Sequence, residues 1–293
     1  MKRAALFAAS CLLGLLPSAC WAQFAAAVTP PRFELRVEPG AVSRNVFEIT
    51  HAAQEVGNYR VYSSDWSMDA TGSVVFHETL QPDSCRPWVS IERRDLIVPM
   101  GARVRFRYEV APPAETAPRE CRFALMVESK AQEVQTGEFT SFPMSGRIGI
   151  IVYVSVAGAS PMLELRKESV VLFDGQLSPA FEIQNTGNAT GRVAGIVQGI
   201  DATGSTIEFS PDSVPILPGQ TRVVTLQPYE PGMKASSTSP PGTLKQRTRT
   251  AIRWPLKLTG RLEYGSVGEK KIPVDRQVEL TTVARPALSS PKR

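Results

Sequence analysis

The sequence has few of the residues on which most enzymes and metal sites depend. Among its 293 residues there are only two histidines, His51 and His77, and four cysteines. Neither histidine stands near a candidate serine or cysteine motif, so a Ser-His or Cys-His hydrolase is poorly supported. The motifs GxSxG, GxxxxGK[ST], HExxH and GxGxxG are also missing. We therefore expect a binding or assembly protein, not an enzyme, with no metal and no other cofactor.

Long apolar runs are equally scarce, and the longest lies at the start, in "MKRAALFAASCLLGLLPSACWAQ". Two basic residues precede the apolar stretch, which ends at small residues. This layout predicts a secretory signal peptide over residues 1–22, cleaved after Ala22. The alternative is a lipoprotein acylated at Cys20, but Pro17 stands where such a motif expects a leucine-like residue. No later segment predicts a membrane span, so we expect a periplasmic protein without stable membrane insertion.

Neither sign of charge dominates the chain. Removal of residues 1–22 takes away two basic residues and no acidic one, and 31 basic minus 28 acidic residues leave a net charge of +3. One basic cluster, "LKQRTRTAIR" (244–253), follows a Pro- and Ser-rich stretch. That context favours a solvated loop and strand edge, and we expect no nucleic-acid partner.

Two cysteines remain after the signal peptide, Cys85 and Cys121. In an oxidising compartment a disulfide is the ordinary state of such a pair. Closing a loop of this length, 121 − 85 = 36 residues, would stabilise the fold by about 3–4 kcal/mol. Metal binding is the rival use, but no other thiol is present and the two histidines lack metal-ligand spacing. The sequence predicts a structural disulfide.

Short segments of β-type alternation follow one another, separated by turn sequences such as "EPG", "DATG" and "APPAETAP". In "ARVRFRYEV" (102–110) apolar and charged residues alternate strictly, as in a half-buried antiparallel strand. The pattern stops at "AGASP" (157–161) and then begins again. Phrases also recur: "LIVPMGARVRF" parallels "PILPGQTRVVTL", and "DATG" occurs at Asp69 and Asp201.

These features predict an all-β chain of two immunoglobulin-like β-sandwich domains in tandem after the signal peptide. The expected boundaries are residues 23–157 for the first domain, 158–161 for the linker, 162–283 for the second domain and 284–293 for a disordered tail.

The first half resembles the immunoglobulin-like periplasmic chaperones of pilus assembly by the chaperone–usher route. The resemblance is carried, in order, by "PPRFELRVEPG", "YRVYSSDWSMDATGSVVF", "CRPWVSIERRDLIVPMGARVRFRYEV", "PRECRFALMV" and "GRIGIIVYVSVAG". The second domain, with "FEIQNTGNATGRV" and "LPGQTRVV", resembles the companion domain more loosely. The resemblance implies a chaperone that binds and caps pilus or other surface-structure subunits, with an outer-membrane usher as a further partner.

In that family the last strand of the first domain is lent to an incomplete subunit, a form of β-strand addition. The matching run is "GRIGIIVYVSVAG" (146–158), whose β-branched residues predict a strand. The resemblance implies that Ile148, Ile150, Val152 and Val154 contact the subunit. We expect this even-numbered face to look outward, and the face with Ile151 and Tyr153 to pack on the chain's own sandwich.

The family also anchors the subunit's C-terminal carboxylate on two basic residues. Arg32 matches the first in position. The second position is occupied by Gly149 in place of a lysine, and Arg147 offers the only charge nearby. Arg147 is therefore either a substitute anchor, since a guanidinium binds a carboxylate bidentately, or a solvated residue at the strand end.

Between the last two strands of the first domain lies the segment 130–146, which is polar with interspersed Phe139, Phe142 and Met144. It fits a loop that becomes ordered when a partner binds, and equally a long hairpin connection.

Two other functions stay open. The chain could be a non-catalytic scaffold or adhesion protein of the cell envelope, in which case the run 146–158 should pair internally on both edges. An enzyme acting on envelope polymers is the third reading, with Asp65 or Glu78 as its reactive carboxylates. Surface acids on a β-sandwich are the ordinary explanation of both residues.

Overall fold

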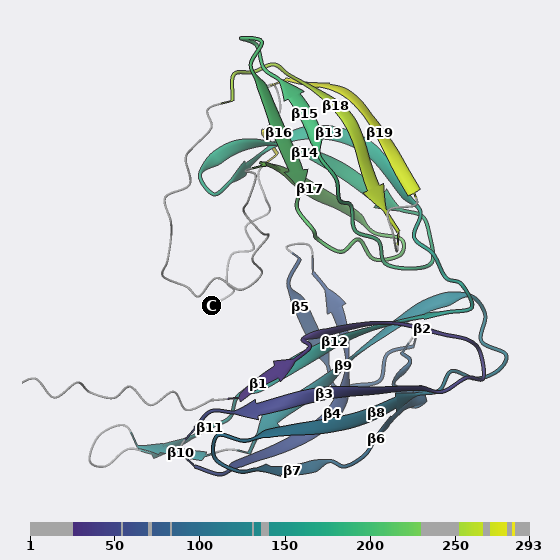
Figure 1. Cartoon of the computed structure of the whole chain (residues 1–293), viewed down its shortest axis with the longest axis vertical. Helices are drawn as coiled ribbons and strands as arrows, with labels where there is room; N and C mark the ends of the chain where they lie inside the picture. Colours follow the sequence, from purple (N-terminus) through teal and green to yellow (C-terminus); the bar gives the residue numbers. More distant parts are fainter. Residues whose placement is uncertain are drawn as a thin grey trace, which may run out of the picture.

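The computed structural model describes residues 26–53, 55–69, 72–82, 84–130, 132–135, 141–229, 252–265, 270–279 and 283–284. The predicted signal peptide lies outside these residues. Of the predicted tail 284–293, only Ala284 is described, and it ends the strand Val283–Ala284. Figure 1 shows two β-domains, the first in purple to teal and the second from teal through green to yellow. In the described part of the chain, no helix has the length and apolar character needed to cross a membrane.

The first domain is a sandwich of two sheets. One sheet has the order β1-β3-β8-β6. The other has the order β2-β12-β9-β4-β5, with β7 also paired to β4. The elements are β1 (Ala26–Thr29), β2 (Arg32–Val37), β3 (Ser43–His51), β4 (Gly57–Met68), β5 (Val74–His77), the 3₁₀-helix η1 (Arg86–Trp88), β6 (Val89–Ile91), β7 (Asp95–Val98), β8 (Arg103–Val110), β9 (Arg119–Ser129) and β12 (Arg147–Val156).

The chain passes from one sheet to the other between β1 and β2. β1 pairs with β3 in the first sheet, and β2 pairs in parallel with β12 in the second. Pro30 and Pro31 occupy the crossing, and because proline has no backbone N–H it cannot donate to a sheet ladder. The crossing therefore fixes where β2 begins to cover the edge of β12.

Strict alternation builds the core of this sandwich. In β8, Phe106, Tyr108 and Val110 are fully buried while the three arginines between residues 103 and 107 are exposed, as the sequence predicts. They pack with Phe47 and Phe123. Burial of this apolar surface is the main stabilising contribution.

The second domain is also a sandwich, and its two sheets share one strand. β17 pairs with β14 through its first half and with β16 through its second half, which joins the strands into the continuous order β19-β18-β15-β16-β17-β14-β13-β20. The strands are β13 (Leu163–Phe173), β14 (Gln176–Asn185), β15 (Val197–Ile200), β16 (Thr206–Pro211), β17 (Thr221–Pro228), β18 (Leu256–Tyr264), β19 (Lys270–Val278) and β20 (Val283–Ala284). The core contains Phe181, Phe209 and Leu262.

The first and last residues of the recurring phrase "DATG" make the same hydrogen bonds in both domains. The N–H groups of Gly72 and Gly204 donate to the carbonyl oxygens of Asp69 and Asp201, at 3.1 and 2.9 Å. The carboxylate Oδ1 of each aspartate also accepts a backbone N–H, from Ser73 and from Ser205. The hydrogen bond from the Thr203 hydroxyl is the main cause that holds the pKa of Asp201 below its ordinary value, and hydrogen bonds from the backbone N–H groups of Thr203 and Ser205 add to it. Aspartate is favoured at such turns for this reason.

Candidate functional site

The run predicted as the lent strand forms β12, and only part of its outer edge is covered. β12 pairs with β9 along its whole length. Its pairing with β2 covers only residues 151–156. The N–H of Ile151 donates to the Pro31 carbonyl at 3.1 Å, and by the alternation of a strand the N–H of Gly149 points to the same side. Within the described residues, no strand pairs with this edge at residues 147–150.

The predicted orientation of β12 is wrong. Ile150, Val152 and Val154 are 0 % exposed and belong to the core of the chain's own sandwich, while Ile148 is half-buried. Ile151 and Tyr153, on the other face, lie in a second apolar cluster with Trp66 and Met126. Both faces of β12 are apolar, and the face toward the second domain is covered by a cluster that includes Leu217 of that domain.

Upstream of β12 the chain forms a hairpin arm. β10 (Gln132–Gln135) and β11 (Ser141–Met144) pair antiparallel with each other. The Ser129 N–H donates to the Gly146 carbonyl at 2.9 Å, which joins this arm to β9 and β12. Figure 1 shows the arm extending beyond the end of the sandwich. The described residues of segment 130–146 therefore form two paired strands, as in the predicted hairpin connection, while Phe139 lies outside the described residues. Ordering of this segment on partner binding stays a prediction.

The two predicted carboxylate anchors do not meet. Arg32 is aligned with Ile151, and Arg147 lies four residues earlier on β12, a separation of about 13 Å along the strand. The Arg32 Nε lies 3.2 Å from Glu34 Oε1. The Arg147 Nη1 lies 3.8 Å from Glu78 Oε1, and both of these side chains are largely exposed.

A basic residue of the second domain, Arg192, lies beside Arg32 in place of Arg147. Its Nη1 donates to Glu34 Oε1 at 2.8 Å and its Nη2 to the Tyr153 hydroxyl at 3.2 Å. Its guanidinium also stacks on the Tyr153 ring, 5.3 Å from the centroid. The Glu34 carboxylate thus lies between two guanidinium groups, one from each domain.

The same contact opposes the effect of burial on the pKa of Tyr153. Burial raises the pKa of Tyr153, and the charges of Arg192 and Arg32 oppose that rise.

Sequence reasoning missed Arg192 because nothing in "GNATGRV" distinguishes it from a solvated turn residue. Only the packing of the two domains brings it to β12.

Gly149 stands where the resemblance implies a lysine, and Phe76 of β5 packs against it. A Cβ at this position would lie 2.8 Å from Cε1 of Phe76 and 3.3 Å from Sδ of Met126. Real Cβ atoms do not approach ring carbons this closely, so the Phe76 ring would have to move. The ring occupies the space that a lysine side chain needs.

The predicted disulfide is present. Cys85 and Cys121 are bonded, with their Cα atoms 5.7 Å apart, a separation typical of disulfides. Both residues are buried. The bond ties the segment before η1 to the first residues of β9. No three His, Cys, Asp or Glu side chains of the described ranges come together as a metal site.

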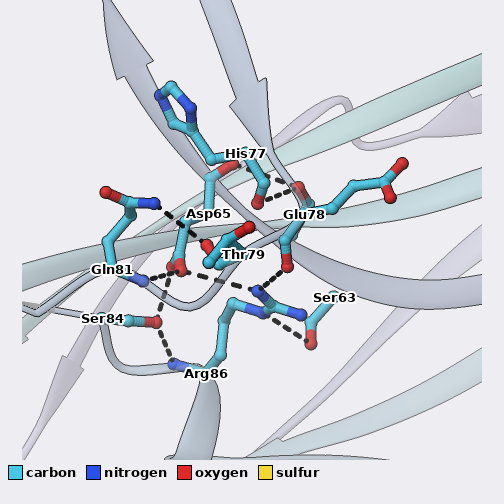
Figure 2. Close-up of polar contacts among 9 residues, drawn as sticks. Ser63, Asp65, His77, Glu78, Thr79, Gln81, Ser84 and Arg86 are labelled. Carbon is cyan, nitrogen blue, oxygen red and sulfur yellow. Dashed lines mark hydrogen bonds and ion pairs between the residues drawn. The ribbon is translucent and has the colours of Figure 1, made fainter.

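Asp65 organises the loop that the disulfide holds (Figure 2). Its Oδ2 accepts the Gln81 N–H at 2.9 Å, and its Oδ1 accepts the Ser84 hydroxyl at 2.6 Å. The Arg86 Nη1 lies 3.6 Å from Oδ2 and donates to the Glu78 carbonyl at 2.8 Å. The Asp65 side chain is 4 % exposed, whereas that of Glu78 is 79 % exposed. The Asp65 carboxylate therefore has structural contacts, whereas the contact of Arg86 with Glu78 is to the backbone carbonyl and not to the carboxylate.

Comparison with solved structures shows that this chain is similar to fimbrial chaperones. No model of a protein family matches the sequence, and no curated protein matches it. The class 5 fimbriae chaperone CfaA has a TM-score of 0.43 and 11% identity, over 71% of this chain and 94% of CfaA. The CupB2 chaperone of Pseudomonas aeruginosa has a TM-score of 0.41 and 11% identity, over 85% of this chain and 99% of CupB2.

A third structure is the pre-assembly complex of the chaperone CsuC with the tip adhesion subunit CsuE, from the archaic chaperone–usher Csu pili of Acinetobacter baumannii. Its TM-score is 0.40 and its identity 12%, over 86% of this chain and 97% of the matched chain. CfaA is a chaperone of fimbriae, CupB2 is a chaperone, and the third structure contains the chaperone of Csu pili; this chain is similar to each of these structures at low sequence identity.

Proposed function

We propose that this protein is a non-catalytic periplasmic chaperone that binds and caps pilus or other surface-structure subunits by β-strand addition. The observation that carries the proposal is the half-covered edge of β12, which is paired to β2 at residues 151–156 and has no described neighbour at residues 147–150. An extended segment of a subunit would pair along this edge. Main-chain hydrogen bonds would supply affinity, and side-chain pockets would supply register.

In this proposal the four predicted subunit-binding residues divide into two roles. Ile148 is half-buried at the open part of the edge, where an added strand would cover it. Ile150, Val152 and Val154 are fully buried and hold β12 in the sandwich while the edge is used. The edge of β11, joined to β12 through Gly146, would lengthen the surface for the subunit.

The carboxylate anchor is proposed at Arg32. Glu34 already presents a carboxylate to Arg32 and Arg192, so these two guanidinium groups suit a carboxylate. The C-terminal carboxylate of a subunit would take the place of Glu34 between them. Arg147 lies four residues before Ile151, the β12 residue aligned with Arg32. It would then be a residue of the open edge and not part of the anchor.

Two substitutions at one position test the strand addition. The N–H of Arg147 points to the open side by the same alternation as that of Gly149, so Arg147→Pro removes an edge donor. Arg147→Ala removes the same side chain and keeps the N–H. Each variant is co-expressed with small secreted subunits encoded beside its gene, and the chaperone is purified. We expect Arg147→Ala to retain the subunit and Arg147→Pro to lose it.

If both variants retain the subunit, strand addition at this edge is wrong. If both lose it while remaining folded by circular dichroism, Arg147 acts through its charge.

The envelope scaffold is the alternative function, supported by the pairing of β12 on both sides over residues 151–156. Retention of no subunit by the wild-type protein would favour it.

A further inference from the structure

The hairpin of β4 and β5 contacts both the second domain and the open part of β12. Figure 1 shows this hairpin rising from the first domain toward the second. Phe76 of β5 packs against Gly149, which lies at the open edge. Asp69 comes directly after β4, and its backbone carbonyl accepts a hydrogen bond from the second domain. The hairpin therefore connects the position of the second domain with the edge.

The open part of β12 is a weak piece of strand by itself. It pairs with β9 on one side, and no described strand pairs with it on the other side at residues 147–150. Gly149 lies within this stretch. A glycine inside a strand lowers its stability, because it has no side chain to pack and loses more backbone entropy on folding. This stretch therefore depends on packing from another element.

The Phe76 ring supplies that packing. A Cβ at position 149 would lie 2.8 Å from Cε1 of Phe76, so the ring covers the backbone of Gly149 directly. An aromatic side chain placed over an edge glycine restores stability to a sheet. The ring comes from β5, which is not a neighbour of β12 in the sheet. Its effect on Gly149 therefore depends on where the hairpin lies.

Two contacts from the second domain hold the hairpin in this position. The Arg222 Nη2 donates to the Asp69 carbonyl at 2.8 Å. Leu217 is 3 % exposed and lies in one apolar cluster with Trp66, the β4 residue that pairs with Phe76. Phe76 itself packs against this cluster. Displacement of the second domain would therefore remove support from Phe76.

Leu217 is presented by a turn that is tied to the second sandwich. The Gln220 N–H donates to the Leu217 carbonyl at 3.0 Å, and the Gln220 carbonyl accepts the Asn185 N–H at 2.9 Å. The side-chain amide of Asn185, which is fully buried, donates to the Ile216 carbonyl at 2.8 Å. Asn185 is the last residue of β14. The turn therefore moves with the second domain.

We propose that docking of the second domain holds the open part of β12 in strand conformation through the β4–β5 hairpin. Leu217 and Arg222 fix the hairpin, and the hairpin places the Phe76 ring over Gly149. Leu217 and Phe76 are thus positioning residues. When the second domain is displaced, residues 147–150 lose this support and open more often. A role of this device in regulating subunit capture rests on the proposed function, whereas the support itself does not.

Hydrogen exchange of the oxidised mature protein tests the support without any subunit. The N–H groups of Ile148 and Ile150 point to β9, because that of Ile151 points to the other side. Leu217→Ala and Arg222→Gln should each lower the protection of these two amides at least about fivefold. The amides of β8 that bond to β3, in the other sheet, should keep their protection.

A double variant tests whether the effect passes through the Phe76 ring. Phe76→Ala should lower the protection of the same two amides. Addition of Leu217→Ala to this variant should cause no further loss, because the support of Leu217 acts through the ring. A merely structural role of Leu217 would add its own loss. Leu217→Met and Phe76→Tyr, which keep the volume and the ring, should restore the protection.

Thr190→Ala is the matched control, because it weakens a contact between the domains that does not involve the hairpin. Glu120 of β9 accepts the Thr190 N–H with Oε2 at 2.8 Å and the Thr190 hydroxyl with Oε1 at 2.5 Å. The substitution removes the hydroxyl. We expect the protection of the Ile148 and Ile150 amides to stay at the wild-type value.

Three outcomes would overturn the proposal. The first is unchanged protection of the two amides in both Leu217→Ala and Arg222→Gln, of which the second leaves the apolar cluster intact. The second is an additive loss in the double variant. The third is an equal loss in Thr190→Ala, which would assign the effect to domain docking without the hairpin. None of these measurements involves a subunit, so a failed capture test contradicts the proposed function alone.

Discussion

The ring of Phe76 lies against the backbone of Gly149, in the place that any side chain at position 149 would occupy. The two residues come from β5 and β12, which are not neighbours in the sheet. A side chain at position 149 would therefore require the Phe76 ring to shift.

Substitution of Gly149 by alanine should destabilise the first domain. The added Cβ meets Phe76 at less than van der Waals distance, and overpacking of this kind costs about 1–3 kcal/mol. Urea unfolding of Gly149→Ala, Phe76→Ala and the double variant measures the coupling between the residues. The double variant should be less destabilised than the sum of the single variants, and a purely additive result would show that the contact has no energetic effect.

Two isoleucines on the same strand should differ in their contribution to stability. Ile150 is fully buried and Ile148 is half-buried at the open edge. Ile150→Ala should lower the free energy of unfolding by about 2–5 kcal/mol. Ile148→Ala should cost less than half as much and should weaken subunit capture instead. Equal losses of stability would mean that the edge at Ile148 is as well packed as the core.

Removal of Arg192 should loosen the two domains and change the titration of Tyr153. Arg192→Gln deletes the charge that bonds Glu34 and the Tyr153 hydroxyl. Because Arg192 opposes the rise in the pKa of Tyr153, its loss should raise that pKa further. Ultraviolet titration follows the tyrosine, and small-angle scattering follows the radius of gyration.

Arg166→Gln is the control for this change, since Arg166 lies in the same domain and pairs with Glu164 at the surface. An unchanged scattering profile in Arg192→Gln would mean that other contacts, such as that of Glu120 with Thr190, are sufficient to hold the domains.

Tyr108 should make the protein sensitive to alkaline conditions. Its hydroxyl is buried and has no hydrogen-bond partner in the described part of the chain, and burial raises the pKa of Tyr108 above its ordinary value. The folded state then holds this proton more tightly than the unfolded state. Stability is therefore unaffected below the unfolded pKa of about 10 and falls as the pH rises above it.

Replacement by phenylalanine isolates this effect. Tyr108→Phe removes an unpaired polar group, so it should leave the stability at neutral pH unchanged or raise it by up to about 1 kcal/mol. Thermal melts from neutral to alkaline pH should show a shallower loss than in the wild type. Tyr153→Phe, which removes a hydroxyl that does have a partner, should destabilise at neutral pH.

The fold could be predicted from the sequence wherever a residue pattern has only one structural interpretation. The alternation of Val104, Phe106 and Tyr108 with arginines allows a single orientation of β8, and the pair Cys85 and Cys121 left only one disulfide to form. Both features depend on local pattern or on composition, which a sequence displays directly.

The orientation of β12 could not be predicted from the sequence. Its two faces carry Ile150 and Val152 on one side and Ile151 and Tyr153 on the other, so periodicity cannot identify the core. The choice depends on Trp66 and Leu217, which arrive from another strand and another domain. Arg192 was missed for the same reason, since its role depends on contacts across more than 150 residues of sequence.

The position of the crossing at Pro30 and Pro31 determines how many residues of the β12 edge stay unpaired. Parallel pairing begins with Arg32 beside Ile151. If the crossing were shifted by one residue along β12, one more or one fewer residue of β12 would be left unpaired. A crossing four residues further back along β12 would cover residues 147–150 and turn β12 into an interior strand throughout. The number of unpaired residues on this edge is therefore set by the N-terminal strand and not by β12 itself.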